Sequence, residues 1–378
     1  MFLPTLPLYI SHVGATPGQV GQVIGGFTIG LLLFRPRLAT FADRQGRKPA
    51  LLIGIAAVAL APIGYALTNS LPLLFATRIF HGLSVAALTL AYSALVADVA
   101  PVQVRAEVLS YMSLATPVGM SLGPALGSTL LEKHGFLTLF FLSSALGSLG
   151  FLLALLLREP AADALAKNQG QKMAFWSLLK LPAVQVPTLM MLLLGLAFGN
   201  LMTFTALYLQ SESIELQAGV FFSCAAMMGF VMRLLAGLTA QRLGRGLLMT
   251  IGIAAYGFAM GLMFVAQSPA EFLAAAVIEG GGFGLVIPAL AAMLADRSQP
   301  EERGRIFGVC LLGLDLGGAI AAPLFGQVAN QLGYRPLFGI TSFMVFLALA
   351  LFATRSSKDL PHSLRFALGK GRDVYALR

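Results

Sequence analysis

The stretch RPRLATFADRQGR at residues 35–47 has a counterpart 198 residues later, RLLAGLTAQRLGR at residues 233–245. The same offset aligns glycines and scarce charged residues along the whole chain. The aligned pairs are Arg35 with Arg233, Arg44 with Arg242, Gly46 with Gly244, Arg47 with Arg245, Gly82 with Gly280, Ala97-Asp98 with Ala295-Asp296, Arg105 with Arg303, Gly119 with Gly317 and Gly135 with Gly333. Because only 11% of the residues are charged, charged coincidences at one offset are hard to produce by chance. The chain is therefore predicted to consist of two equivalent halves.

The composition is that of a membrane protein. Apolar residues make up 57% of the 378 residues, against roughly 45–50% in soluble proteins. Apolar stretches of about 20 residues, long enough to cross a bilayer as helices, are predicted at residues 18–40, 49–68, 71–96, 106–131, 136–157, 183–209, 217–240, 246–266, 269–293, 303–330 and 334–354. The apolar fragment at residues 1–10 resembles the end of a truncated first span. The predicted fold is an all-α membrane protein built from two six-helix bundles.

The predicted organisation is an N-terminal bundle with an incomplete first span, a linker, a C-terminal bundle and a basic tail. These segments are residues 1–158, 159–182, 183–354 and 355–378. The linker is the longest polar insertion and holds the only tryptophan, Trp176. Because the repeat preserves membrane orientation, a parallel pseudo-twofold repeat about the membrane normal is expected, as in parallel-repeat transporters. By the same offset, part of the first span is expected to precede Met1.

The loops predict how the chain is oriented. If alternate loops lie on opposite sides, the side with the linker and the tail carries about 19 Lys and Arg, against Lys133 and Arg335 on the other. That side is predicted to be cytoplasmic, which gives a multi-pass protein of the plasma membrane, the inner membrane in bacteria, with a cytoplasmic C-terminus. The tail either lies on anionic headgroups or is solvated. The net charge of +9 does not indicate nucleic-acid binding, since the basic residues are spread over short loops.

The loop ATFADRQGRK at residues 39–48 resembles the signature G-x-x-x-D-[RK]-x-G-[RK]-[RK] of the major facilitator superfamily. Asp43 ends one predicted helix, and Gly46 permits a tight turn. The resemblance implies that Asp43 latches the two halves by pairing with Arg105 or nearby basic residues; the alternative is a basic loop that only sets orientation. The candidate gating residues are Asp43, Arg44, Gly46, Arg47, Lys48, Asp98 and Arg105. Two departures, Ala39 for the first glycine and Gln241 for the second-half aspartate, predict weaker helix packing and a one-sided latch.

Residues 74–87 resemble the fourth-helix pattern R-x-x-q-G-x-g-a-a of the same superfamily, with His81 and Ser84 in place of glutamine and glycine. Arg78 and His81 are three residues apart and share a helix face. An arginine within a span costs roughly 2.5–3.5 kcal/mol, so Arg78 is expected to face a wet cavity or a partner. The repeat aligns His81 with Glu279, which places two groups able to take up a proton at equivalent positions. Glu279 either serves coupling or pairs with an arginine.

The stretch GMSLGPALGS at residues 119–128 resembles the fifth-helix motif g-x-x-x-G-P-x-x-G-G of the superfamily's drug:proton antiporter branch, with Ser128 at the last glycine. Its characteristic residues are Gly119, Gly123, Pro124 and Gly127. Glycines four apart permit close approach of another helix, and proline removes a backbone donor and bends the helix. The resemblance implies a face that meets the opposite half and seals against leak. Ordinary helix packing is the alternative.

Ionisable residues within predicted spans are candidates for coupling and solute binding. They are Arg35, Arg78, His81, Arg233, Glu279 and Asp315. Three arginines against two carboxylates favour an anionic or zwitterionic solute, unless pairing among them cancels the bias.

These observations predict a secondary active transporter that exports a small molecule in exchange for protons by alternating access. A solute uptake or exchange carrier of the same superfamily is one alternative, and a non-transporting sensor or assembly component is another. We expect a monomer in the lipid bilayer whose partners are a small solute and protons. No phosphate-binding loop and no metal-ligand spacing of histidines is present, so neither an enzyme nor a cofactor or metal is expected. Cys224 and Cys310 lie in apolar segments and predict no disulfide.

Overall fold

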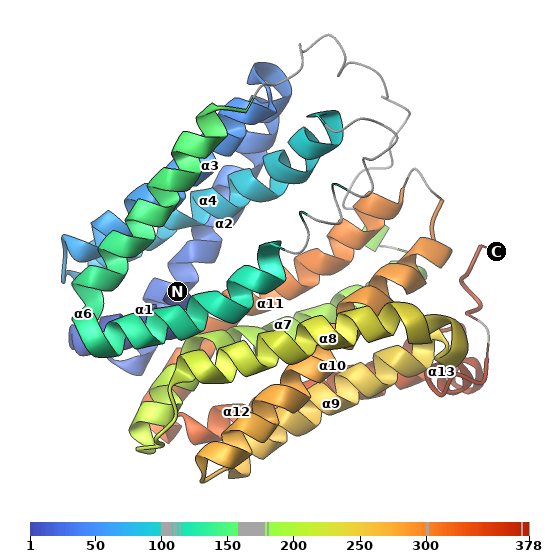
Figure 1. Ribbon diagram of the computed structural model, residues 1–378. Coiled ribbons are helices and arrows are strands. Elements are labelled where there is room, and N and C mark those ends of the chain that lie inside the picture. The colour runs from blue at the N-terminus through green and yellow to red at the C-terminus, as the bar shows by residue number, and fades with distance from the viewer. Residues whose placement is uncertain are drawn as a thin grey trace. The chain divides into compact units, whose positions relative to one another are not determined.

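The computed structural model describes residues 1–99, 108, 112, 115–157, 178–179, 181–299, 302–371 and 373–377, and in this part of the chain all regular structure is helical. The helices are α1 (Phe2–His12), α2 (Pro17–Gln45), α3 (Arg47–Ala66), α4 (Leu71–Val99), α6 (Ala115–Leu155), α7 (Pro182–Ser211), α8 (Ala218–Leu243), α9 (Arg245–Val265), α10 (Pro269–Asp296), α11 (Arg303–Leu332), α12 (Arg335–Arg355) and α13 (Leu360–Ala367) (Figure 1). Ten of these described helices are long and apolar enough to cross a membrane. The prediction of an all-α fold with long apolar helices is confirmed.

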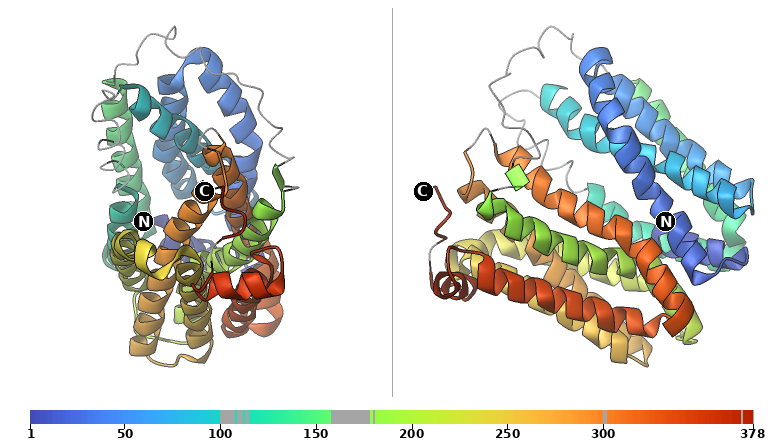
Figure 2. Two further views of the ribbon diagram at one scale, coloured as in Figure 1. Left: turned by 90° about the vertical axis from the view of Figure 1, so that its right-hand side faces the viewer. Right: turned by 180° about the vertical axis from the view of Figure 1, so that it is seen from behind.

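The chain divides into two compact units, residues 1–171 and 172–378. In the first unit, α4 packs against α2 and α3, and α3 packs against α6. In the second unit, α10 packs against α8 and α9, and α9 packs against α12 (Figures 1 and 2). These three helix contacts therefore recur in both units in the same order along the chain.

Hydrogen bonds repeat at the offset found in the sequence. Ser144 donates from Oγ to the carbonyl oxygen of Ala59 over 2.8 Å, and Ser342 donates to the carbonyl oxygen of Gly257 over 2.9 Å. Donor and acceptor are both displaced by 198 residues. The repeat therefore extends from the sequence to individual contacts.

Close helix contacts at glycine repeat as well. A Cβ at Gly82 would overlap the carbonyl oxygen of Phe27, and a Cβ at Gly280 would overlap that of Ala225. These pairs join α4 to α2 and α10 to α8, again 198 residues apart. Only a residue without a side chain permits the helices to approach this closely.

Two further equivalent glycines turn the chain between spans. Gly135 has φ 76° and interrupts α6, and Gly333 has φ 77° between α11 and α12. A positive φ is strained for residues with a Cβ, so glycine is favoured at both turns. The break in α6 lies between the predicted helices at residues 106–131 and 136–157.

The tail beyond α12 contains a helix that the sequence pattern did not predict, α13. Asp359 caps α13 by accepting a hydrogen bond from the backbone N–H of His362 over 2.9 Å. The side chains of Ser363, Phe366 and Ala367 are buried, and α13 packs against α9 and α12. One face of α13 is therefore docked on the second unit.

Candidate functional site

The first unit contains a buried polar cluster around His81 on α4. The Tyr65 hydroxyl lies 3.1 Å from Nδ1 of His81, and the Arg78 guanidinium approaches the same nitrogen to 3.5 Å. Both neighbours can donate a hydrogen bond, so Nδ1 lies where an acceptor is needed. The prediction that Arg78 and His81 share a helix face is met, but the partner Tyr65 on α3 was not foreseen.

Aromatic rings surround this cluster. The guanidinium carbon of Arg78 lies 4.5 Å from the centre of the Phe27 ring, close enough for a cation–π interaction. Phe2 and Phe27 contact the His81 ring edge-on, at centroid distances of 5.9 and 5.5 Å. Nε of Arg78 is buried without a hydrogen-bond partner among the described residues. One donor of the cluster therefore stays available to a bound group.

In the second unit, Glu279 is buried at 4% exposure on α10. No arginine, lysine or histidine of the described residues forms an ion pair with it. The alternative that Glu279 simply pairs with an arginine therefore has no support within that part of the chain.

The second unit also buries polar groups that have no hydrogen-bond partner among the described residues. The Tyr256 hydroxyl on α9 interacts electrostatically with the Glu279 carboxyl group, and it is buried with no hydrogen-bond partner in the described chain. Both side-chain amide atoms of Asn200 on α7 are buried and unpartnered in the same sense. Buried polar groups are normally hydrogen-bonded, so these atoms are candidates to form hydrogen bonds with a water molecule or a solute.

The gating loop is described in part. Gly46 separates α2 from α3 with φ 99°, as Gly244 separates α8 from α9 with φ 79°. Lys48 donates from Nζ to the carbonyl oxygens of Leu155 and Leu157 at the end of α6. Arg105 and most of the predicted linker, including Trp176, lie outside the described residues, as do the side chains of Asp43 and Asp98. The predicted latch stays a prediction.

The remaining candidate charges are spread over several helices. Arg35 is half-buried on α2, Arg233 is exposed on α8, and Asp315 is half-buried on α11. Arg44 is exposed at the end of α2, and Arg47 is half-buried at the start of α3. Because these residues belong to two separate units, no common site is assigned to them.

The antiporter-like motif lies in the first part of α6. A Cβ at Gly123 would lie 3.0 Å from the backbone nitrogen of Met1, and one at Gly127 would lie 2.7 Å from its carbonyl oxygen. A Cβ at Gly119 would meet no atom within 4 Å, and Pro124 is buried. Two glycines of the motif thus serve close packing against the start of α1.

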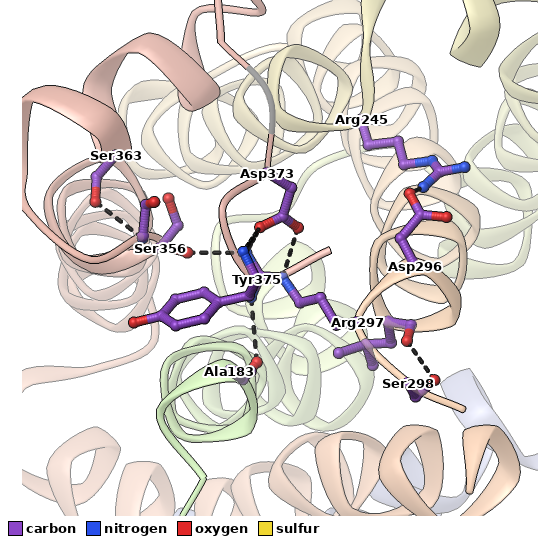
Figure 3. Close-up of polar contacts among 11 residues, drawn as sticks. Ala183, Arg245, Asp296, Arg297, Ser298, Ser356, Ser363, Asp373 and Tyr375 are labelled. Carbon is purple, nitrogen blue, oxygen red and sulfur yellow. Dashed lines mark hydrogen bonds and ion pairs between the residues drawn. The ribbon is translucent and has the colours of Figure 1, made fainter. Parts of the chain in front are cut away.

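A charged network that no sequence motif predicts lies at the end of α10 (Figure 3). Arg297 donates from Nε and Nη2 to the two carboxylate oxygens of Asp373, over 2.6 and 3.1 Å. It also donates to the carbonyl oxygens of Ala183 and Ser356, over 3.1 and 2.8 Å. The two charged side chains are 1% and 8% exposed. Arg297 therefore joins the start of α7, the end of α12 and the C-terminal segment.

A second ion pair adjoins this network. Arg245, the first residue of α9, pairs with Asp296, the last residue of α10. Both belong to the repeat, since the offset aligns them with Arg47 and Asp98. Arg297 directly follows Asp296, which the repeat aligns with Asp98. This position next to a repeated acidic residue is the sequence feature that could have indicated the network.

These features define a multi-pass membrane protein whose two helical units repeat one another and bury ionisable groups in apolar spans. The sequence matches the family described as Major Facilitator Superfamily over residues 1–256 and again over residues 189–372. The chain therefore belongs to the major facilitator superfamily, and the resemblance seen in its motifs is confirmed.

Curated relatives include proteins named for drug resistance. The chain is 24% identical over 209 residues to the quinolone resistance protein NorA of Staphylococcus aureus (strain MSSA476), covering 55% of this chain and 54% of NorA. It is 30% identical over 179 residues to multidrug resistance protein 1 of Bacillus subtilis (strain 168), covering 46% of this chain and 45% of that protein. The matched regions thus span about half the length of these relatives. They agree with a placement near the drug:proton antiporter branch.

Solved structures share the fold. A mutant of the nucleoside transporter NupG superposes with a TM-score of 0.78 at 16% identity, covering 93% of this chain and 95% of that one. A bacterial homologue of the human lysosomal transporter Spinster, inward-facing and unoccupied, superposes with a TM-score of 0.77 at 17% identity, covering 99% of this chain and 94% of that one. At these identities the likeness concerns the fold.

Proposed function

We propose that the chain is a secondary active transporter that exports a small molecule in exchange for protons by alternating access. The observation that carries the proposal is that the repeat aligns two ionisable residues, His81 in the first unit and Glu279 in the second. Each is an ionisable residue in an apolar span, and the two occupy equivalent positions of the repeat. A buried carboxyl group without a cation partner favours its neutral form, so Glu279 is suited to take up a proton and to lose it when its surroundings become wet.

Glu279 is the proposed coupling residue. When it is neutral, its carboxyl group can lie in the apolar interior of the second unit at low cost. When it is charged, it needs donors, and the Tyr256 hydroxyl is the nearby candidate because the two side chains interact and the hydroxyl has no other described partner. Proton uptake and release at Glu279 would thereby change the contacts between α9 and α10.

Arg78 and His81 are the proposed solute-binding residues of the first unit. The available Nε of Arg78 and the rings of Phe2 and Phe27 combine a fixed positive charge with flat apolar surfaces. Such a cluster suits a flat aromatic solute with an acidic or other hydrogen-bond-accepting group. The relatives named for quinolone and multidrug resistance support a solute of this kind.

The rest of the predicted arrangement belongs to the same proposal. Asp43, Asp98 and Arg105 serve as the gating charges, and the basic loops and the C-terminus lie in the cytoplasm in accordance with the positive-inside rule. The protein acts as a monomer.

Transport in everted membrane vesicles tests the proposal. A preset pH gradient is followed with a fluorescent dye while flat aromatic acids and cationic drugs are added in turn. Antiport predicts that a transported solute dissipates the gradient and that Glu279→Gln removes this response while the protein still inserts. Glu271→Gln is the matched control, because Glu271 lies on the same helix but is exposed at its first turn.

Other outcomes separate the alternatives. Solute accumulation by intact cells without proton exchange would instead support an uptake carrier, and no response to a broad panel would support a non-transporting component. Unchanged proton exchange in Glu279→Gln would remove this residue from the mechanism.

A further inference from the structure

The outer face of α13 carries a row of exposed leucines. Leu360, Leu364 and Leu368 are 51%, 41% and 53% exposed. Residues four apart lie on one side of a helix, so these side chains form a continuous apolar strip. The adjoining face of α13 packs on the second unit, because Ser363, Phe366 and Ala367 are buried there.

The depth of α13 follows from its contacts with α9. Helix α9 has 21 residues, about 32 Å at 1.5 Å per residue, so it just spans a hydrocarbon core of about 30 Å. A Cβ at Gly246, in its first turn, would overlap the carbonyl oxygen of Phe366. Thr250 donates a 2.8 Å hydrogen bond to the carbonyl oxygen of Ala367. The helix α13 therefore lies level with the first turns of a span, at the boundary between hydrocarbon and headgroups.

The C-terminal segment holds α13 in this place. The ion pair between Arg297 and Asp373 fixes the chain after the helix, and the backbone N–H of Leu377 donates to the carbonyl oxygen of Asp296 over 2.8 Å. In Figures 1 and 2, α13 runs across the ends of the long helices of its unit. A helix in this position lies in the plane of the membrane surface.

Exposed basic residues adjoin the leucine strip. Arg355 and Lys358 precede α13, Arg365 lies on it, and Lys370 follows it. None of the four forms an ion pair with an acidic residue of the described chain. Near an anionic membrane surface each basic side chain is attracted by about 1 kcal/mol, and an amphipathic helix buries its apolar side at that boundary.

We propose that α13 is an interfacial helix that binds anionic phospholipids: the leucine strip enters the acyl boundary, and the basic residues, Arg365 above all, contact the phosphate groups. The proposal rests on the membrane location of the chain and not on proton-coupled transport, so either can fail without the other.

Lipid affinity tests the basic residues. Phosphatidylglycerol and phosphatidylcholine are titrated into the purified full chain in detergent, and the apparent Kd is read from thermal stability. Arg365→Gln is expected to weaken phosphatidylglycerol binding about fivefold, the change set by one basic residue near an anionic surface, and to leave phosphatidylcholine binding unchanged. Lys133→Gln, an exposed basic residue at the predicted opposite side, should change neither. Equal affinity for both lipids, or an equal loss in both variants, would overturn the proposal, as would equal stabilisation by inorganic phosphate.

A fluorescence probe tests the leucine strip. In a Trp176→Phe background, which removes the only tryptophan, Leu364→Trp and His362→Trp are compared in nanodiscs containing brominated phosphatidylglycerol. The proposal predicts quenching and a blue-shifted emission for Leu364→Trp, and weaker effects for His362→Trp, whose side chain points from another side of the helix. Equal or absent quenching at both positions would contradict insertion of this face, even where the affinity test is met.

Discussion

Arg297 and Asp373 lie 76 residues apart in the sequence and form a two-point ion pair in which both side chains are buried. The same guanidinium binds carbonyl oxygens at the start of α7 and at the end of α12. The C-terminal segment is thereby an integral part of the second unit.

Removing one partner of this pair should destabilise the protein. In Asp373→Asn the Arg297 charge stays buried without a counter-ion, and breaking a buried ion pair in this way costs roughly 3–5 kcal/mol. The thermal unfolding midpoint of the purified chain in detergent should fall markedly. Asp359→Asn is the control, since Asp359 is an exposed acid of the same segment and asparagine is an equally good helix cap. Equal midpoints for the two variants would contradict a structural role for the pair.

The close contact between α10 and α8 gives a second prediction. Gly280→Ala forces a methyl group onto the carbonyl oxygen of Ala225, and such overpacking typically costs about 1–3 kcal/mol. Gly308→Ala, on α11, meets nothing within 4 Å and should be neutral or slightly stabilising, because alanine favours helices over glycine by up to about 1 kcal/mol. Unfolding midpoints in detergent should separate the two variants, and a tolerated Gly280→Ala would show that the helices separate readily.

A third prediction concerns the hydroxyl that holds His81. Tyr65→Phe removes the 3.1 Å contact with Nδ1, and a lost buried hydrogen bond is worth about 1 kcal/mol. We expect severalfold slower solute-driven proton exchange in everted vesicles at unchanged protein levels. Tyr92→Phe, in which an exposed hydroxyl on α4 is lost, should match the wild type. Identical rates for the two variants would place Tyr65 outside the site.

The cap of α13 gives a pH-dependent prediction. The backbone N–H of His362, and then its side chain, bind the Asp359 carboxylate and lower the pKa of Asp359 below its ordinary value. Because the folded pKa is the lower one, the cap stabilises α13 at neutral pH, and its contribution is lost as the pH falls through that lowered value. Asp359→Ala should mimic the acidic state and speed amide hydrogen exchange in residues 362–367 at pH 7, whereas Asp359→Asn should preserve protection. Unaltered exchange in the alanine variant would mean that docking alone holds α13.

Much of the fold was predictable because its determinants are local or periodic. Apolar runs of about 20 residues mark spans, and the 198-residue offset predicted which residues are equivalent in the two halves. The hydrogen bonds of Ser144 and Ser342 show that the repeat preserves individual contacts. Their acceptors, Ala59 and Gly257, are different residues, but each bond is made to a backbone carbonyl group and so does not depend on the side chain.

The rest depends on contacts that no pattern along the chain reveals. Helix α13 has eight residues, too few for an apolar run to stand out, and its leucine spacing becomes informative once the buried face is known. The partner of Arg297 is Asp373, one of two acidic residues in a basic tail. The partner of His81 is Tyr65, which lies on another helix. For Glu279, the sequence predicted a rare charge within a span, but only the packing shows that no basic residue of the described chain forms an ion pair with it.

The buried position of Asp373 bears on how the protein is best handled. A recombinant form that ends at or before Arg372 would leave a guanidinium sealed in the bundle without its counter-ion, and low yield would then reflect the cut and not the transport machinery. Affinity tags and fluorescent fusions are therefore better joined through a flexible spacer beyond the last residue than substituted for the final turn of the chain.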